Sequence, residues 1–288
     1  MTRERLRLSN SQLYSVSTCG EAYRRRYVEG ERVPGSLQMA RGIAVHRVAQ
    51  AMHRRQVEAK AGGATPMEAI GVLPTREEAR DQGVAAFEAH IEAEGVSVQP
   101  DEIDASGSSG AAKGRTLDTV AAMSGFYAHR VAPKVDPLAV ERKIVTQPKD
   151  ASYEIVGIID LIEDGGMSEA GREIISDLKT TTRAPKKNAI NTSVQLPIYT
   201  LLRASETGVM PRETVLRHLV ERPTGIEVVV QRLAPSKANL LATVARMEAA
   251  ARSIRAGVFL PAEAGHWKCS LRWCEFAPTC QFFLGGAE

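Results

Sequence analysis

Long apolar runs and cysteines are both scarce in this sequence of 288 residues. No stretch approaches the ~18 consecutive apolar residues that a membrane-spanning helix needs, which argues against a membrane protein. The first ten residues alternate arginine with other residue types and lack the apolar core of a signal peptide, so we expect a cytoplasmic protein. Four cysteines are too few for a disulfide scaffold in a chain of this length, and we expect them to be buried or to bind metal.

Lysine and acidic residues are also scarce near the start of the chain. The whole protein has a net charge of +3, yet residues 1–55 hold eleven arginines, no lysine, four glutamates and no aspartate. A basic end of this kind suits a polyanionic partner such as nucleic acid. The alternative is an ordinary solvent-exposed helix face whose arginine stems cover the core.

The apolar periodicity changes from helical to strand-like near residue 136. Helices are predicted over residues 10–27, 40–58, 76–93 and 115–131, with Ser9 or Asn10 as the first N-cap and a loop over 97–114. Strands are predicted over residues 138–146, 153–163, 173–180, 215–221 and 227–233, with helices over 192–204 and 235–256. The sequence therefore predicts an α/β fold in which a mixed β-sheet is flanked by helices and follows a helical region.

Two aspartates and a lysine stand out in two neighbouring predicted strands. If these strands form a hairpin with its turn near Ser168, positions whose numbers sum to about 337 face each other, and Asp160 lies opposite Asp177. Asp177 and Lys179 are two residues apart, so their side chains leave the same face of the strand. Because like charges repel in a buried site, the pair suits a divalent cation, Mg²⁺ or Mn²⁺. The alternative is an exposed Asp–Lys pair on an ordinary hairpin.

Such a cluster has a specific use in cleaving phosphodiester bonds. A bound cation lowers the pKa of its water and neutralises charge on the scissile phosphate. Lys179 can then orient the nucleophile or stabilise the pentacoordinate phosphate.

Several motifs occur around this cluster in a fixed order. They are Gly42-x-x-x-His46, Glu141, Gly157-x-x-Asp160, Asp177-Leu178-Lys179 followed by Thr180, and Gln195-x-x-x-Tyr199. The set resembles the PD-(D/E)XK nuclease superfamily, and most closely its RecB-like branch, which includes exonucleases of recombination helicases, CRISPR-adaptation nucleases and phage exonucleases. The resemblance implies a restriction-endonuclease-like core and a metal-dependent deoxyribonuclease, an exonuclease that acts on single-stranded DNA or DNA ends.

The resemblance also implies roles for individual residues. His46, Asp160, Asp177 and the backbone carbonyl of Leu178 would hold one or two Mg²⁺ or Mn²⁺ ions. Lys179 would activate the attacking water, and the helix residues Gln195 and Tyr199 would position DNA. Recombination, CRISPR-adaptation or phage replication proteins are the partners that such relatives have. The alternative is a protein that binds DNA or a partner on a nuclease-like fold without cleaving.

The four cysteines lie at the two ends of the chain, Cys19 near the start and Cys269, Cys274 and Cys280 near the end. Four thiolates fit a [4Fe–4S] cluster or a zinc site. One N-terminal and three C-terminal cysteines resemble the iron–sulfur staple of some RecB-like nucleases, although four residues separate the first two C-terminal cysteines where two are common. Zinc, or no metal at all, is the alternative.

The neighbourhood of Cys19 is a candidate DNA path. Tyr23 precedes Arg24, Arg25 and Arg26, and arginine beside aromatic residues suits a single strand through phosphate contacts and base stacking. We predict four segments: core helices over 1–55, a helical insertion over 56–135, the nuclease core over 136–260 and a cysteine-containing segment over 261–288.

Overall fold

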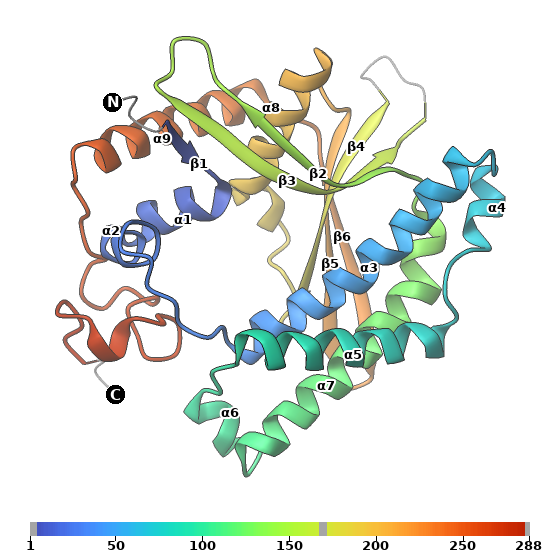
Figure 1. Cartoon of the computed structure of the whole chain (residues 1–288), viewed down its shortest axis with the longest axis horizontal. Coiled ribbons are helices and arrows are strands. Elements are labelled where there is room, and N and C mark those ends of the chain that lie inside the picture. Colours follow the sequence, from blue (N-terminus) through green and yellow to red (C-terminus); the bar gives the residue numbers. More distant parts are fainter. Residues whose placement is uncertain (1–4, 167–171, 286–288) are drawn as a thin grey trace.

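The computed structural model describes residues 5–166 and 172–285 and contains a six-stranded mixed sheet with helices on both faces (Figure 1). The strands are β1 (Leu6–Leu8), β2 (Pro137–Thr146), β3 (Tyr153–Asp164), β4 (Glu173–Thr181), β5 (Glu213–Arg222) and β6 (Gly225–Leu233). Their order is β1-β3-β4-β5-β6, and β2 also pairs with β3. The predicted fold class is therefore confirmed. The predicted turn near Ser168 lies outside the described residues.

Nine α-helices connect and cover these strands within the described ranges. They are α1 (Asn10–Thr18), α2 (Gly20–Tyr23), α3 (Leu37–Ala61), α4 (Pro66–Ile70), α5 (Arg76–Glu94), α6 (Pro100–Asp104), α7 (Ser109–Phe126), α8 (Gln195–Thr207) and α9 (Lys237–Arg255). Short π or 3₁₀ segments cover Arg24–Val28, Tyr127–Val131, Ala132–Lys134, Ala189–Thr192 and Ala277–Thr279. None of the helices found in this part of the chain is long and apolar enough to cross a membrane.

Local signals explain where several helices begin. Ser9 caps α1 and exchanges hydrogen bonds with Gln12, which confirms the first N-cap prediction. The loop predicted over residues 97–114 is wrong in part, because α6 lies within it and α7 already begins at Ser109. The Ser108 side chain accepts the amide hydrogen of Ala111 and so starts α7 six residues earlier than predicted.

The first predicted helix is interrupted at Cys19. Cys19 has an extended backbone (φ −156°, ψ 106°), and the chain restarts as α2 at Gly20. Gly20 donates its amide hydrogen to the carbonyl of Leu260 at 2.6 Å, and a Cβ atom at this position would lie 2.6 Å from the Leu260 nitrogen. A segment from the other end of the chain therefore causes this break, and a helical periodicity cannot indicate it.

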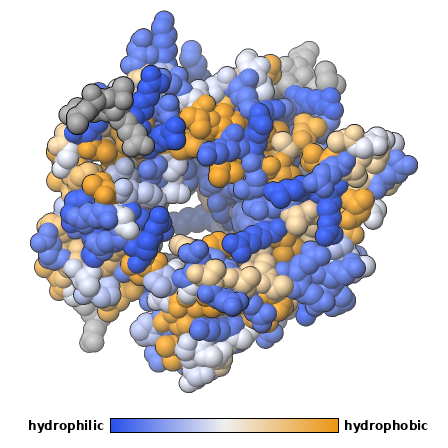
Figure 2. All heavy atoms as spheres, viewed as in Figure 1, coloured by the Kyte–Doolittle hydropathy of each residue, from blue (hydrophilic) through white to orange (hydrophobic). Residues whose placement is uncertain are grey.

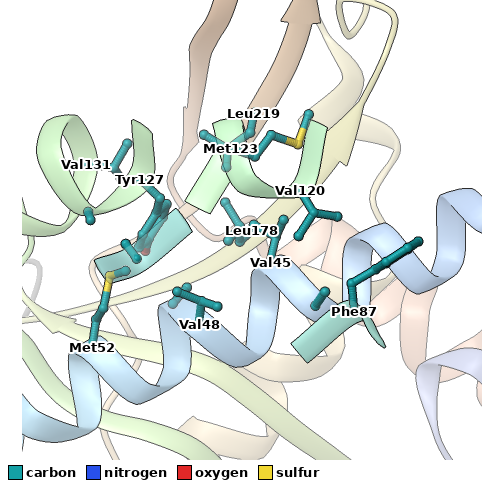
Figure 3. Packing of buried hydrophobic residues seen from close by; sticks show 14 of the residues in the cluster. Val45, Val48, Met52, Phe87, Val120, Met123, Tyr127, Val131, Leu178 and Leu219 are labelled. Atoms are coloured by element: carbon teal, nitrogen blue, oxygen red, sulfur yellow. The ribbon is translucent and has the colours of Figure 1, made fainter. Parts of the chain in front are cut away.

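Two apolar cores lie on opposite faces of the sheet. On one face α3, α5 and α7 pack against sheet residues such as Leu178 and Leu219, and Figure 3 shows Val45, Val48 and Met52 of α3 pointing into this core. On the other face α1, α8 and α9 pack against β1, β2 and β3. Each such fully buried aliphatic side chain contributes about 1.5–3 kcal/mol. The helices after residue 56 thus share one core with the sheet.

The helices around the sheet leave an open region. Figure 1 places α1, α2 and the C-terminal segment apart from α3, and Figure 2 shows an opening in the same face of the molecule between them.

Candidate active site

Asp160, Asp177 and Lys179 meet where strands β3 and β4 separate. The antiparallel pairing of the two strands ends with Leu161 opposite Ser176, which confirms the predicted register, and the next positions are the two aspartates. From there β4 continues beside β5. The Asp177 side chain is fully buried, and Lys179 Nζ lies 2.8 Å from its Oδ2 and 3.0 Å from its Oδ1. Two carboxyl groups and one ammonium group therefore share the fork of the sheet.

A hydrogen-bonded chain connects the lysine to helix α8. Lys179 donates to Gln195 Oε1 at 2.9 Å, and Gln195 Nε2 donates to the Tyr199 hydroxyl at 2.7 Å. The close approach of α8 to β3 depends on Gly157, where a Cβ atom would lie 2.5 Å from Leu202 and 3.3 Å from Tyr199. The glycine of the Gly-x-x-Asp motif is thus required by packing, and the two helix residues reach the lysine because of it.

His46 approaches the aspartates from α3 on the other side of the fork. Its Nε2 lies 2.6 Å from the carbonyl oxygen of Leu178, and its Nδ1 lies 3.4 Å from Asp160 Oδ2. Since a carbonyl can only accept, Nε2 carries the proton in this arrangement. Gly42 lies one turn earlier on α3. A Cβ atom at this position would lie 3.5 Å from Thr180 Oγ1, so the helix passes close to the end of β4. The imidazole, the carbonyl and both carboxyl groups face one space.

A third acid lies beside Asp160. Glu141 on β2 has a left-handed backbone (φ +52°), which is uncommon for a residue other than glycine and marks local strain. Its carboxylate accepts a hydrogen bond of 2.6 Å from Gln50, one turn after His46 on α3. Sequence reasoning noted Glu141 from the resemblance but missed Gln50, although its spacing of four residues from His46 places both on one helix face.

Burial and like charge dominate the electrostatics of the site. Burial first, and then the nearby Asp177 carboxylate, raises the pKa of Asp160 well above its usual range, and Glu141 adds to this effect. Burial lowers the pKa of His46, so its imidazole is neutral at neutral pH. A neutral imidazole is the form that binds metal. The site therefore favours either a proton or a cation between its carboxylates.

The donor set suits a divalent cation, although it is not preformed. Two aspartates and a carbonyl supply the oxygen ligands that Mg²⁺ and Mn²⁺ prefer, and a cation would offset the burial and the Asp177 repulsion that raise the pKa of Asp160. Among the described residues, no group of three or more His, Cys, Asp and Glu side chains already has the arrangement of a metal site. The Lys179–Asp177 contact accounts for part of this, because it uses oxygen atoms that a cation would need.

Sequence reasoning also missed His218 on β5. His218 lies opposite Lys179 in the parallel β4–β5 pair, so both side chains leave the same face of the sheet. Its Nε2 is buried and has no hydrogen-bond partner within the described residues. The only signal in the sequence is a histidine in a strand next to the Asp-x-Lys strand.

The cysteines from both ends of the chain come together in the structure. Cys19, Cys269, Cys274 and Cys280 all line one pocket of about 30 Å³ with an apolar wall. Burial raises the pKa of the Cys269 and Cys274 thiols, and the other cysteines add to the effect. The backbone amide of Ala262 donates to Cys19 Sγ at 3.3 Å. The fold thus brings all four cysteines to one pocket, although within the described residues their side chains are not already arranged as a metal site.

Of the predicted DNA-contacting residues, Tyr23, Arg25 and Arg26 contact the C-terminal part of the chain, whereas Arg24 pairs only with neighbours in the sequence. Tyr23 is buried and stacks on Phe259 at a ring distance of 5.8 Å. The arginine ion pairs are Arg24–Glu21, Arg24–Glu29, Arg25–Glu31 and Arg26–Glu275. Arg25 is also buried and donates to a backbone carbonyl of the C-terminal segment at 3.2 Å. In this arrangement Tyr23 and Arg25 serve packing, while Arg24 and Arg26 are partly exposed.

Comparison with known proteins agrees with this geometry. The sequence profile of the PD-(D/E)XK nuclease superfamily matches residues 7–281. This chain belongs to the PD-(D/E)XK nuclease superfamily. A member of this superfamily has a nucleic acid as its substrate, and such nucleases generally use divalent metals. Membership in the RecB-like branch stays a prediction.

Two solved structures are similar to this chain at low sequence identity. The protein SSO0001 is 14% identical with a TM-score of 0.41, and the match covers 99% of this chain and 90% of that one. A protein of Eubacterium rectale, provisionally named an exonuclease, is 10% identical with a TM-score of 0.47 over 91% of this chain and 85% of its own. A comparison with curated proteins gave no match.

Proposed function

We propose that this protein is a Mg²⁺- or Mn²⁺-dependent deoxyribonuclease that acts as an exonuclease on single-stranded DNA or DNA ends. The observation that carries the proposal is the meeting of Asp160, Asp177 and Lys179 at the fork between β3 and β4, with His46 opposite. A protein that only binds DNA has no need of two carboxylates that face each other with a lysine beside them, because burial and their mutual repulsion raise the pKa of Asp160.

Each residue of the site has a chemical role in this proposal. His46, Asp160, Asp177 and the Leu178 carbonyl would hold the metal, which supplies an activated water and charge neutralisation at the phosphate. With Asp177 holding the metal, Lys179 would orient the attacking water and stabilise the negative charge that develops on the phosphate.

Gln195 would keep Lys179 in position when Asp177 holds a metal ion. It accepts from Lys179 and donates to Tyr199, so it keeps the ammonium group at the fork while the Asp177 oxygens are engaged elsewhere. The Gln195 amide and the Tyr199 hydroxyl can each make a further hydrogen bond, and we propose that they use it to bind the DNA backbone.

The test is cleavage of an end-labelled single strand with Mn²⁺ and with chelator. We expect cleavage by the native protein with Mn²⁺ alone, and a loss of at least 10³-fold in Asp160→Ala and Lys179→Ala. Lys143→Ala is the matched control, because Lys143 is an exposed lysine on the neighbouring strand β2. Full activity in either site variant, or DNA binding without any cleavage by the native protein, contradicts the proposal.

We also propose that the four clustered cysteines hold a [4Fe–4S] cluster that ties the chain ends together. The proposal is supported by their common apolar pocket and by the amide directed at Cys19. A cluster attaches each thiolate to a different iron, so it accepts a wider spacing of sulfur atoms than one zinc ion does.

Iron and zinc analysis of anaerobically purified protein separates the alternatives. We expect about four iron atoms per chain and an absorption band near 400 nm, with both lost in Cys274→Ser. One zinc per chain supports the zinc alternative, and a colourless metal-free protein contradicts both.

A further inference from the structure

We propose that an aromatic pocket beside the cysteines is a stacking site for the bases of single-stranded DNA on the way to the active site. This inference rests on the proposed function and adds to it a second, separate contact with the strand. The aromatic pocket is defined by Tyr14, Tyr27 and Trp273 with Arg26 and Lys268, and its volume is about 400 Å³. This volume is within the range of ~300–1,000 Å³ typical of small-molecule sites, which is enough for a base.

The exposure of the aromatic side chains needs an explanation. The protein has two tryptophans, and both are exposed, Trp267 by 58% and Trp273 by 46%. Tyr14 and Tyr27 in the same area are exposed by 46% and 38%. Large aromatic groups normally contribute their area to a core, and a group of exposed ones marks a binding surface.

The two tryptophans support each other as a rigid unit. Their rings meet edge to face with centroids 5.8 Å apart. The His266 ring packs against Trp267, with a centroid distance of 5.7 Å. Trp273 is therefore held in place with one part of its ring in the aromatic pocket. Flat, fixed rings of this kind bind any base, since every base has a π-face.

Positive charge accompanies the rings. Lys268 places its ammonium group 4.4 Å from the centre of the Tyr14 ring, and the Arg272 guanidinium lies 5.0 Å from that of Trp273. Arg26 pairs with Glu275 in the aromatic pocket, so Lys268 supplies the net positive charge there. A base stacked on the rings would thus have cations within reach of its phosphate.

The pocket on the other side of Trp273 has the opposite character. It is lined by Asp101, Glu102 and Glu275 and by a single cation, Arg272, which pairs with Asp101, so its net negative charge disfavours phosphate. We therefore expect the strand to leave Trp273 on the side of the aromatic pocket.

Helix α3 connects the aromatic pocket to the active site. Met39 lines the pocket, and Gly42, His46 and Gln50 follow at intervals of three or four residues, so the four form one stripe along the helix. All four are at least partly accessible. Seven residues separate Met39 from His46, which corresponds to about 10 Å along the axis. About three stacked nucleotides of one strand cover this distance.

Intrinsic tryptophan fluorescence tests the inference directly, because Trp273 lines the aromatic pocket and the other tryptophan, Trp267, packs against it. The titrant is a twelve-residue oligodeoxythymidylate in chelator, so that no strand is cleaved. We expect quenching by the single strand, and about tenfold weaker binding by fluorescence anisotropy of a labelled strand in Trp273→Ala. Trp273→Phe keeps a stacking ring, so its affinity stays within about twofold of native.

Leu271→Ala is the matched control. Leu271 is exposed on the same segment but does not line the aromatic pocket, so its removal leaves affinity unchanged. Unchanged affinity in Trp273→Ala overturns the inference, as does equal quenching by a blunt duplex. If the native protein cleaves DNA while Trp273→Ala binds normally, this inference fails and the proposed function stands. If Trp273→Ala loses affinity but the native protein does not cleave, the stacking site stands and the proposed function fails.

Discussion

The charge conflict at Asp160 predicts that Asp160→Asn makes the metal-free protein more stable while it removes activity. The Asp160 pKa is raised by burial and by Asp177, so the native fold binds a proton there more tightly than the unfolded chain does. The stabilisation that the bound proton gives the native fold is fully present below about pH 4 and is lost as the pH rises through the raised pKa. Asparagine does not ionise, so at pH 7.5 the variant keeps the free energy of unfolding that the native protein loses with this proton.

The size of the effect follows from linkage. Each pH unit by which the native fold raises the Asp160 pKa corresponds to about 1.4 kcal/mol. The Asp160 side chain is 20% exposed, so solvent removes part of this. We therefore expect a gain of roughly 1–3 kcal/mol, which raises the melting temperature by roughly 2–6 °C in a chain of this size.

Thermal unfolding in chelator at pH 7.5 and pH 4.5 measures this gain. The variant should melt higher than native at pH 7.5 and near native at pH 4.5, and saturating Mn²⁺ should stabilise only the native protein. Asp164→Asn is the control of opposite sign, because Asp164 is paired with Arg172 and its pKa is lowered, so the variant should melt lower at pH 7.5. A variant at position 160 that melts at or below native in chelator at pH 7.5 refutes the reasoning.

Three further substitutions test the surroundings of the site. Gly157→Ala places a methyl group against Leu202 and should cost about 1–3 kcal/mol in denaturant unfolding and lower cleavage, since α8 must move. Gln50→Ala leaves Glu141 without its hydrogen bond and should lower kcat in Mn²⁺ while the melting temperature changes little; a native kcat contradicts its positioning role. Arg217→Ala leaves a buried Glu163 unpaired and should cost about 3–5 kcal/mol in unfolding, and a loss below 1 kcal/mol contradicts this.

Local patterns in the sequence predict much of the fold and of the site. Strand periodicity predicts that Asp160 lies opposite Asp177. In a hairpin the register is fixed by counting outward from the turn, so the sum of two paired positions is constant. The apolar stripe of α3 and the cap at Ser9 are equally local signals, and both are present. Burial of Val45, Val48 and Met52 follows from their helical spacing.

Contacts between distant parts of the chain account for what the sequence could not predict. The break at Cys19 is caused by Leu260, and the short strand β1 exists only because Leu6–Leu8 pairs with β3 more than 140 residues away. The arginines and tyrosines around Arg25 in the sequence suggest that it binds DNA. In the structure it donates hydrogen bonds to Phe276 and Thr279 of the C-terminal segment. Periodicity carries no information about such partners.

The most direct test of the central claim measures metal occupancy and cleavage in the same samples. Mn²⁺ bound to the native protein and to Asp160→Asn is counted by electron paramagnetic resonance across a titration, and single-strand cleavage is followed at each point. The account predicts that the native protein binds one or two Mn²⁺ ions, that cleavage rises with occupancy, and that the variant lacks both. Cleavage that persists without bound Mn²⁺ or Mg²⁺, or equal metal binding by the variant, contradicts it.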